Sequence, residues 1–430
     1  MVLQAASLSV RSGARRILFR NVGALYVLQI AGYVLPFVSI PVLVRALGAE
    51  GYGRLVFAQA MTMYVVFLVD AGFNSSALRM VSASAHERRF VSEVYWGTQF
   101  IKVALAVLGL VLLNWTIYGH ESLLVDRDVF YGQMLMVLGT ISMPTWLFTA
   151  LERLEAVATC EMFGRLVSVC SIAIFIRSPD DLVLASFLQG GATLLSGILA
   201  HAIWVRGMVS LGGAAPSVVL RLARAGKSYF FAELVRSISS NSTLVVLSGV
   251  IDRHGVGVFA SLEKLIRAAR AGLTPVATAV FPRVVRGLAD DRAAGLRYAW
   301  KCTGMLFAAG VVAAAGISLF GEWVLHTAFG AEMAAYSGIL VILTGWLALN
   351  TLTVTLGQLL LLAGGYAKGF LILNVTSNLI SLLGVIWFTR TSGLEGAAAG
   401  MLLGEAFAGI ALIPILWSLK LYWQSQKTGD

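Results

Sequence analysis

Nine ionisable residues of this sequence stand inside long apolar runs, where a charge needs a partner or a wet cavity. They are five bases and four acids: Lys102, Arg236, Lys264, Arg267, Arg270, Asp70, Glu233, Glu263 and Glu405. On insertion scales each costs about 2.5–3.5 kcal/mol at the centre of a membrane helix. Bases in such places can bind anions, and acids can bind protons or other cations. These residues are therefore the first candidates for a functional site.

The densest group lies in the run 256–281. At 100° per residue, Glu263, Arg267 and Arg270 fall within about 60° of one another on a helix. Lys264 lies at the edge of the same face. The spacing predicts a cationic stripe that faces a cavity and binds an anionic ligand.

Internal neutralisation is the alternative interpretation of this stripe. Glu263 would pair with Arg267 four residues on, and Glu233 would pair with Arg236. The runs 229–251 and 256–281 still hold four bases and two acids, so a cationic surplus remains. Arg236, and Lys102 in the run 93–114, complete the set of substrate-binding candidates.

Asp70, Glu233 and Glu405 are candidates for ion coupling. A carboxylate in a low-dielectric cavity takes up a proton more readily, because burial disfavours its charged form. For Asp70, Lys102 and Glu405, pairing that serves structure alone is an equal alternative.

Neutral polar residues form two further stripes. Asn350, Thr351, Thr355 and Gln358 share one side of the run 337–363, and Asn374 and Asn378 lie one turn apart in the run 367–389. Such stripes suit a sugar, which presents hydroxyl groups, and equally suit hydrogen bonds between helices. Glycines at 396, 400 and 404 predict close helix packing, and prolines at 36 and 41 predict a bent helix.

Motifs of soluble enzymes fail at particular positions. The sequence GKS at 226–228 resembles the end of a phosphate-binding loop, but Arg221 stands where the first glycine is needed. The pair HE at 86–87 is followed by Phe90, where a zinc protease needs its second histidine. The sequence DRD at 126–128 indicates solvated loop charges. The five histidines and three cysteines lack metal-ligand or disulfide spacing, so we expect no cofactor, no metal and cysteines that serve as small packing residues.

Composition identifies the elements that must position these residues. Of 430 residues, 58% are hydrophobic and only 13% are charged, with a mean hydropathy of +0.83. Soluble proteins carry about 25% charged residues. We therefore expect an all-α polytopic membrane protein with twelve spans. The runs are 21–46, 54–77, 93–114, 129–150, 158–176, 182–205, 229–251, 256–281, 298–320, 337–363, 367–389 and 396–419.

The distribution of basic residues predicts the topology. With the N-terminus inside, 21 of the 32 lysines and arginines fall in cytoplasmic segments, six on the other face and five inside helices. Bases gather in cytoplasmic loops, so both termini are expected in the cytoplasm. The same rule explains the net charge of +10 without nucleic acid as a partner.

The domain boundaries follow from the polar breaks. We expect a cytoplasmic basic segment at 1–20, a six-helix bundle at 21–206, a cytoplasmic linker at 207–228, a second six-helix bundle at 229–419 and a cytoplasmic tail at 420–430. Part of the linker, 218–225, is expected to form a short basic amphipathic helix on the membrane surface. A shift of 204 residues aligns the glycines at 51 and 53 with those at 255 and 257, and Arg79 with Arg283. The two bundles are therefore predicted to be a parallel repeat.

Several stretches resemble a known family. They are PFVSIPVLVRALGAEGYG at 36–53, DAGF at 70–73, GVFASLEK at 257–264, Pro275, FPR at 281–283, GGYAK at 364–368 and GLEGAA at 393–398. Over essentially the whole chain the sequence is similar to the Wzx-type polysaccharide (O-antigen) flippases. These form the polysaccharide transporter branch of the multidrug/oligosaccharidyl-lipid/polysaccharide exporter superfamily.

The resemblance implies two bundles around a V-shaped central cavity, open alternately to each side of the bacterial inner membrane. It implies transport, not enzymatic catalysis, of an undecaprenyl-pyrophosphate-linked oligosaccharide, without ATP and with ion-gradient coupling. The expected partners are this lipid-linked oligosaccharide, membrane lipid, a polysaccharide polymerase and a chain-length regulator. The pyrophosphate would then be the anion held by the bases of the run 256–281.

Two other functions fit a polytopic chain. A multidrug/cation antiporter of the same fold would favour an acidic cavity, which the basic surplus disfavours. A polysaccharide polymerase or ligase would carry a large periplasmic loop with catalytic Arg or His residues, and no loop here exceeds about 25 residues.

Overall fold

The protein is described by a computed structural model, whose backbone covers 2–70, 72–84, 87–210 and 212–425. The described side chains do not include those of 2–31, 33–34, 36–37, 228–229, 231–241 and 418–425. Glu233 and Arg236 therefore lie outside the described side chains. Within the described backbone the elements are helices, with no strand among them, which confirms the all-α prediction.

The chain forms two compact units, Met1–Ile238 and Ser239–Asp430. The boundary falls inside one helix, α10 (Pro216–Ser248), which also contains the basic segment 218–225. That segment continues directly into the next predicted span and is not a separate surface helix. The division at 206 and 229 stays a prediction.

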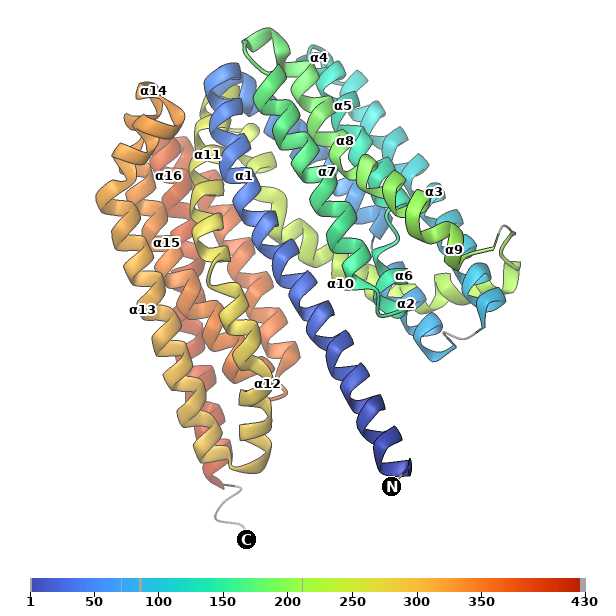
Figure 1. Cartoon of the computed structure of the whole chain (residues 1–430). Coiled ribbons are helices and arrows are strands. Elements are labelled where there is room, and N and C mark those ends of the chain that lie inside the picture. The colour runs from blue at the N-terminus through green and yellow to red at the C-terminus, as the bar shows by residue number, and fades with distance from the viewer. Residues whose placement is uncertain (1, 71, 85–86, 211, 426–430) are drawn as a thin grey trace. The chain divides into compact units, whose positions relative to one another are not determined.

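The first unit is built on five long helices. They are α1 (Val2–Asp70), α3 (Arg88–Tyr118), α5 (Arg127–Ser142), α7 (Leu154–Phe175) and α8 (Leu182–Ala200). Shorter elements connect them: α2 (Phe73–Ala83), α4 (Glu121–Leu124), α6 (Thr145–Ala150), η1 (Pro179–Asp181), η2 (His201–Val205) and α9 (Arg206–Met208). Figure 1 shows α5, α7 and α8 side by side, and α8 packs against both of the others.

The second unit contains α11 (Arg253–Ala271), α12 (Thr274–Asp290), α13 (Arg292–Val324), α15 (Ser337–Leu356) and α16 (Ala367–Ser425). The elements η3 (Leu325–Phe329), α14 (Ala331–Ala334) and η4 (Gly357–Leu362) connect them. In Figure 1, α15 lies beside α13 and α16, and it also packs against α11. The buried interior of this unit includes Leu359, Leu360 and Leu412.

Glycines make the closest helix contacts possible. A Cβ at Gly400 would collide with the backbone of Gly384 and Val385, and one at Gly404 would lie 2.6 Å from Ser381 Cβ. The helix α16 is interrupted at Ser392 and Gly393, and these contacts pack its two halves against each other. The predicted packing role of the glycines in the last run is confirmed.

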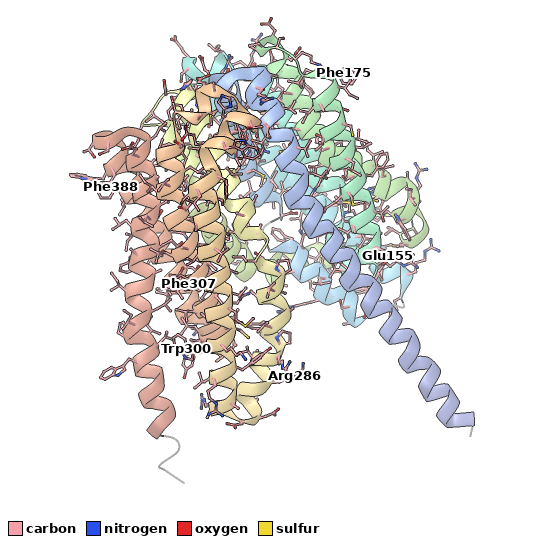
Figure 2. The ribbon with its side chains drawn as sticks, turned by 60° about the vertical axis from the view of Figure 1, so that its left-hand side comes forward. Glu155, Phe175, Arg286, Trp300, Phe307 and Phe388 are labelled. Atoms are coloured by element: carbon pink, nitrogen blue, oxygen red, sulfur yellow. The ribbon has the colours of Figure 1, made fainter. Side chains whose placement is uncertain are left out.

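Seven helices of the described structure are long and apolar enough to cross a membrane. Two of them are interrupted: α1 is non-helical at Gly48, and α16 at Ser392 and Gly393. Large apolar side chains such as Phe175 and Trp300 project from the helices, at 58% and 50% exposure (Figure 2). Such a surface suits lipid and supports a multi-pass membrane protein, while the count of twelve spans stays a prediction.

Three predicted runs are broken in the structure. The run 54–77 is interrupted at Gly72, whose φ of 77° is left-handed, and the run 129–150 at Pro144, which has no N–H to donate. The run 256–281 divides into α11 and α12 between Ala271 and Thr274, and Pro275 stands in the first turn of the new helix. The parallel repeat of the two halves stays a prediction.

Two minor expectations need correction. Asp126 is not a solvated loop charge, because its carboxylate is buried and paired with the Arg54 guanidinium. Of the cysteines, Cys160 and Cys302 are buried as packing residues, whereas Cys170 is exposed.

Candidate functional site

The second unit contains a polar cavity of about 200 Å³, named here the unit 2 cavity. Four helices supply its polar lining: α10, α11, α15 and α16. The polar residues are Arg267, Arg270, Asn350, Thr353, Asn374, Ser377, Asn378, Ser381 and Glu405, with Thr243 of α10. Hydrophobic residues of the lining include Trp346 and Phe370. Asn350 of one predicted polar stripe, both asparagines of the other and both arginines of the sequence analysis therefore meet at one place.

Glu405 is held by two neutral donors across a helix interface. Asn350 Nδ2 donates to Glu405 Oε1, and Thr353 Oγ1 donates to Oε2, each at 2.6 Å. Both donors belong to α15 and are buried, so the carboxylate ties α16 to α15. Arg267 and Arg270 also interact with Glu405 electrostatically. A carboxylate with neutral donors as its direct partners can accept a proton without breaking an ion pair.

The two arginines have different surroundings. Arg267 Nε and Nη2 donate to Glu263 Oε1 at 2.9 and 2.7 Å, and Glu263 is only 5% exposed. This is the intrahelical pair considered as the alternative, and the guanidinium also lies 5.7 Å from the centre of the Trp346 ring. Arg270 lines the unit 2 cavity and a neighbouring one of about 180 Å³. That second cavity is also lined by Thr351, Thr355 and Gln358.

Lys264, at the edge of the predicted stripe, is half-buried on α11 and does not belong to the lining of either cavity. The stripe is therefore divided: Arg267 and Arg270 line the cavity, and Lys264 lies beyond it. Lys264 follows Glu263 by one residue, a rotation of about 100° around the helix axis, and therefore lies at the margin of the face that lines the cavity.

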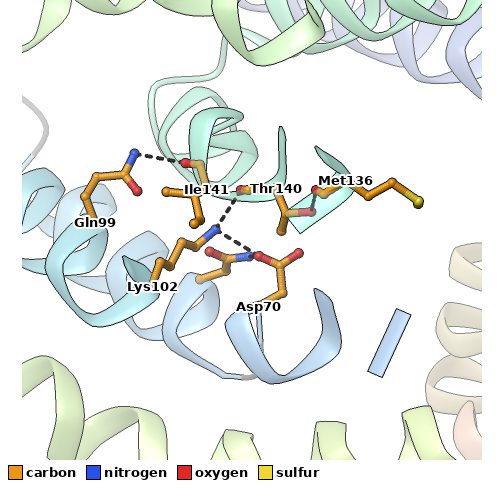
Figure 3. A network of polar contacts seen from close by, with 7 residues as sticks. Asp70, Gln99, Lys102, Met136, Thr140 and Ile141 are labelled. Atoms are coloured by element: carbon orange, nitrogen blue, oxygen red, sulfur yellow. Dashed lines mark hydrogen bonds and ion pairs between the residues drawn. The ribbon is translucent and has the colours of Figure 1, made fainter. Parts of the chain in front are cut away.

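The first unit holds its own charged network (Figure 3). Lys102 Nζ donates to Asp70 Oδ1 at 2.8 Å and to the Thr140 carbonyl at 3.4 Å. Asn74 Nδ2 donates to the same Asp70 oxygen at 2.9 Å. Lys102 is 1% exposed and Asp70 is 39% exposed. The structure thus brings two predicted residues together as a pair and leaves the lysine buried behind its partner.

A separate chain of hydrogen bonds begins one turn before Lys102 on α3. Gln99, one turn before Lys102, donates from Nε2 to the Ile141 carbonyl at 3.1 Å and to Tyr95 Oη at 3.0 Å. Tyr95 Oη lies 2.6 Å from His201 Nε2, and His201 Nδ1 lies 3.0 Å from the Gly197 carbonyl. A neutral histidine that donates from Nδ1 accepts at Nε2, so the tyrosine donates to the histidine.

Sequence reasoning missed this chain and several other polar groups. Tyr95 and His201 are 106 residues apart, and no periodicity connects them. Glu161 and Arg165, which are not among the nine candidates, lie within an apolar helix and pair at 2.9 Å. The spacing of four residues inside the run 158–176 is the signal that could have revealed that pair.

The sequence matches a family model and is similar to proteins of Escherichia coli and Haloferax volcanii. Residues 18–288 match the family model described as "Polysaccharide biosynthesis protein". The chain is 26% identical over 408 residues to the "Putative O-antigen transporter" of Escherichia coli K12, covering 94% of this chain and 97% of that protein. It is 23% identical to the "Probable low-salt glycan biosynthesis flippase Agl15" of Haloferax volcanii, covering 89% of this chain and 80% of the relative.

Solved structures share the fold. The inward closed conformation of the lipid II flippase MurJ matches with a TM-score of 0.70 at 14% identity, over 94% of this chain and 87% of that one. An inward-facing MATE family multidrug resistance transporter of the MOP superfamily matches with a TM-score of 0.67 at 17% identity, over 95% and 100%. These likenesses show the transporter fold alone. The family match covers more than half of the sequence and confirms the resemblance: the chain belongs to the polysaccharide biosynthesis protein family, as a Wzx-type flippase and not an enzyme.

Proposed function

We propose that the protein moves an undecaprenyl-pyrophosphate-linked oligosaccharide from the cytoplasmic to the periplasmic leaflet of a bacterial inner membrane. Transport would use alternating access and supply a surface polysaccharide such as O-antigen. The names of the relatives, an O-antigen transporter and a glycan biosynthesis flippase, support this substrate class. Enzymes that polymerise the repeat unit, with their chain-length regulator, would consume the product.

One observation carries the proposal: a polar, charged cavity lies inside an apolar helical unit. Arg267, Arg270 and Glu405 line it together with amide and hydroxyl side chains. Charges that are so costly in a membrane persist where they contact a polar ligand. We assign Arg267 and Arg270 to the headgroup of the lipid-linked oligosaccharide, while Lys264 of α11 and Arg236, which lies outside the described side chains, stay candidates for substrate binding. The two arginines in the cavity disfavour the multidrug/cation antiporter, whose substrate is cationic.

Ion coupling is part of the proposal, and Glu405 suits it best among the described candidates. Its direct partners are neutral, so uptake of a proton changes the charge of the cavity without separating an ion pair. Asp70 pairs with Lys102 at 2.8 Å, which supports a structural role for this pair in the first unit. Glu233 stays a candidate for coupling.

Deletion of the gene tests the function directly. We expect loss of the surface polysaccharide and accumulation of lipid-linked repeat units whose glycan faces the cytoplasm. Everted and right-side-out vesicles, treated with a membrane-impermeant reagent that labels glycan, measure that orientation. A deletion strain with normal polysaccharide and no accumulated lipid would contradict the proposal.

The predicted topology has its own test. Single cysteines at Ser122 and Gly213, in a background without the native cysteines, should be labelled from opposite sides, with position 122 periplasmic. Equal labelling of both positions from outside would contradict the arrangement with both termini in the cytoplasm.

A further inference from the structure

We propose that the unit 2 cavity binds a single sugar ring of the glycan and does not bind the pyrophosphate. This inference rests on the proposed function, because it divides the headgroup of the lipid-linked oligosaccharide between two places. Three observations carry it: the charge balance of the cavity, the hydrogen-bonding groups on its wall, and its size.

Among the described side chains, the charges of the cavity lining and of its direct partners balance. The lining holds Arg267, Arg270 and Glu405, and Glu263, which lies outside the lining, pairs with Arg267, while Glu405 interacts with both arginines. Lys264, the remaining base of the stripe, does not line the cavity. A pyrophosphate would bring at least one uncompensated negative charge into a low-dielectric site, which is costly. A ligand without net charge meets no such cost.

The wall on α16 offers hydrogen-bond acceptors. Asn374 Nδ2 donates to the Phe370 carbonyl and Asn378 Nδ2 to the Asn374 carbonyl, each at 2.8 Å. Each amide nitrogen donates one of its two hydrogens to its own helix, so the second hydrogen and the side-chain oxygen can both bond a ligand. A sugar hydroxyl can use both groups, whereas a fully ionised phosphate has no proton to donate to the oxygens. The arginines of α11 can donate to the ring and hydroxyl oxygens of a sugar.

The size and the apolar lining agree with one ring. The cavity of about 200 Å³ is smaller than the 300–1,000 Å³ that is typical of sites for drug-sized ligands. Trp346 and Phe370 supply apolar surface beside the polar groups, a combination that matches the C–H and O–H faces of a pyranose. A whole repeat unit would extend beyond this space.

Two probes distinguish binding of the glycan from binding of the pyrophosphate. They are undecaprenyl pyrophosphate without sugar, and the glycan-bearing lipid extracted from the deletion strain. Their dissociation constants are measured with the full-length protein in lipid nanodiscs. We expect the wild-type protein to bind the glycan-bearing lipid about tenfold more tightly, the equivalent of one or two hydrogen bonds. The double variant Asn374→Leu/Asn378→Leu should bind both lipids equally, with an unchanged constant for the lipid without sugar.

The chain provides a matched control for folding. Asn114 on α3 makes the same bond to the carbonyl four residues earlier, at 2.9 Å, and lies in the first unit. Asn114→Leu should keep the preference for the glycan-bearing lipid. Equal binding of the two lipids by the wild type would overturn the inference, as would a double variant that loses the lipid without sugar. Binding of neither lipid by folded wild-type protein would overturn the proposed function itself.

Discussion

The two units each place a carboxylate inside the helical core, but they treat its charge differently. In the first unit Asp70 accepts a hydrogen bond from the buried ammonium of Lys102, and the pair is packed against α5. In the second unit Glu405 accepts hydrogen bonds from the amide of Asn350 and the hydroxyl of Thr353, beside a cavity. An ion pair fixes both protonation states, whereas neutral donors leave a carboxylate able to gain a proton. We therefore propose a structural role for the first pair and a role in transport for the second group.

The largest effect is expected from Asp70→Asn. The substitution leaves the Lys102 ammonium buried at 1% exposure without its counter-charge, which costs about 3–5 kcal/mol. Total stabilities of folded proteins are about 5–15 kcal/mol, so the amount of protein in the membrane should fall sharply. Asp70→Asn/Lys102→Met removes both charges and should recover most of the loss. Thermal unfolding in detergent measures both variants, and a double variant no more stable than the single one would refute the structural assignment.

Arg270→Glu should have the next largest effect, on transport and not on the amount of protein. It turns a balanced cavity into one with a net negative charge, facing the oxygens of the substrate. We expect no surface polysaccharide in a complemented deletion strain, with the protein present in the membrane. Normal polysaccharide from well-expressed Arg267→Ala/Arg270→Glu would return these arginines to a purely structural role.

Gly404→Ala should have an intermediate effect that is confined to the second unit. The added Cβ would lie 2.6 Å from Ser381 Cβ and 2.7 Å from the Ser377 carbonyl, and both serines line the cavity. Overpacking of this kind costs about 1–3 kcal/mol. The matched control is Gly369→Ala in the same helix, where an added Cβ meets no atom within 4 Å. Equal melting temperatures for the two variants would show that the two halves of α16 can move apart to accept the added Cβ, and would contradict the tight contact at Gly404.

Arg270→Lys is expected to have the smallest effect. The charge is kept, but the planar group that donates two parallel hydrogen bonds is lost. Polysaccharide should therefore be reduced and still detectable. Complete loss would indicate that the geometry of the guanidinium matters more than its charge.

Helical periodicity in the sequence predicted contacts between residues of the same helix. Glu263 and Arg267 are four residues apart on one helix, so their pairing followed from spacing, and so did the grouping of Asn374 with Asn378. The contact of Lys102 with Asp70, or of Asn350 with Glu405, depends on which helix faces meet, and one sequence does not encode that in a local pattern. Thr353 and Trp346 were missed because threonine and tryptophan are ordinary residues of membrane helices. Breaks were missed where an apolar run continued through Gly72 or Pro144.

Transport by two variants tests the assignment of roles most directly. Vesicles containing the lipid-linked repeat unit from the deletion strain are reconstituted with wild type, Asp70→Asn/Lys102→Met or Glu405→Gln, and a proton gradient is imposed. A membrane-impermeant glycan label measures the rate at which the glycan changes sides. The account predicts that the charge-free pair in the first unit keeps gradient-driven transport, while Glu405→Gln loses the response to the gradient. A folded Glu405→Gln that responds as the wild type does, or a folded pair variant that does not transport, would contradict it.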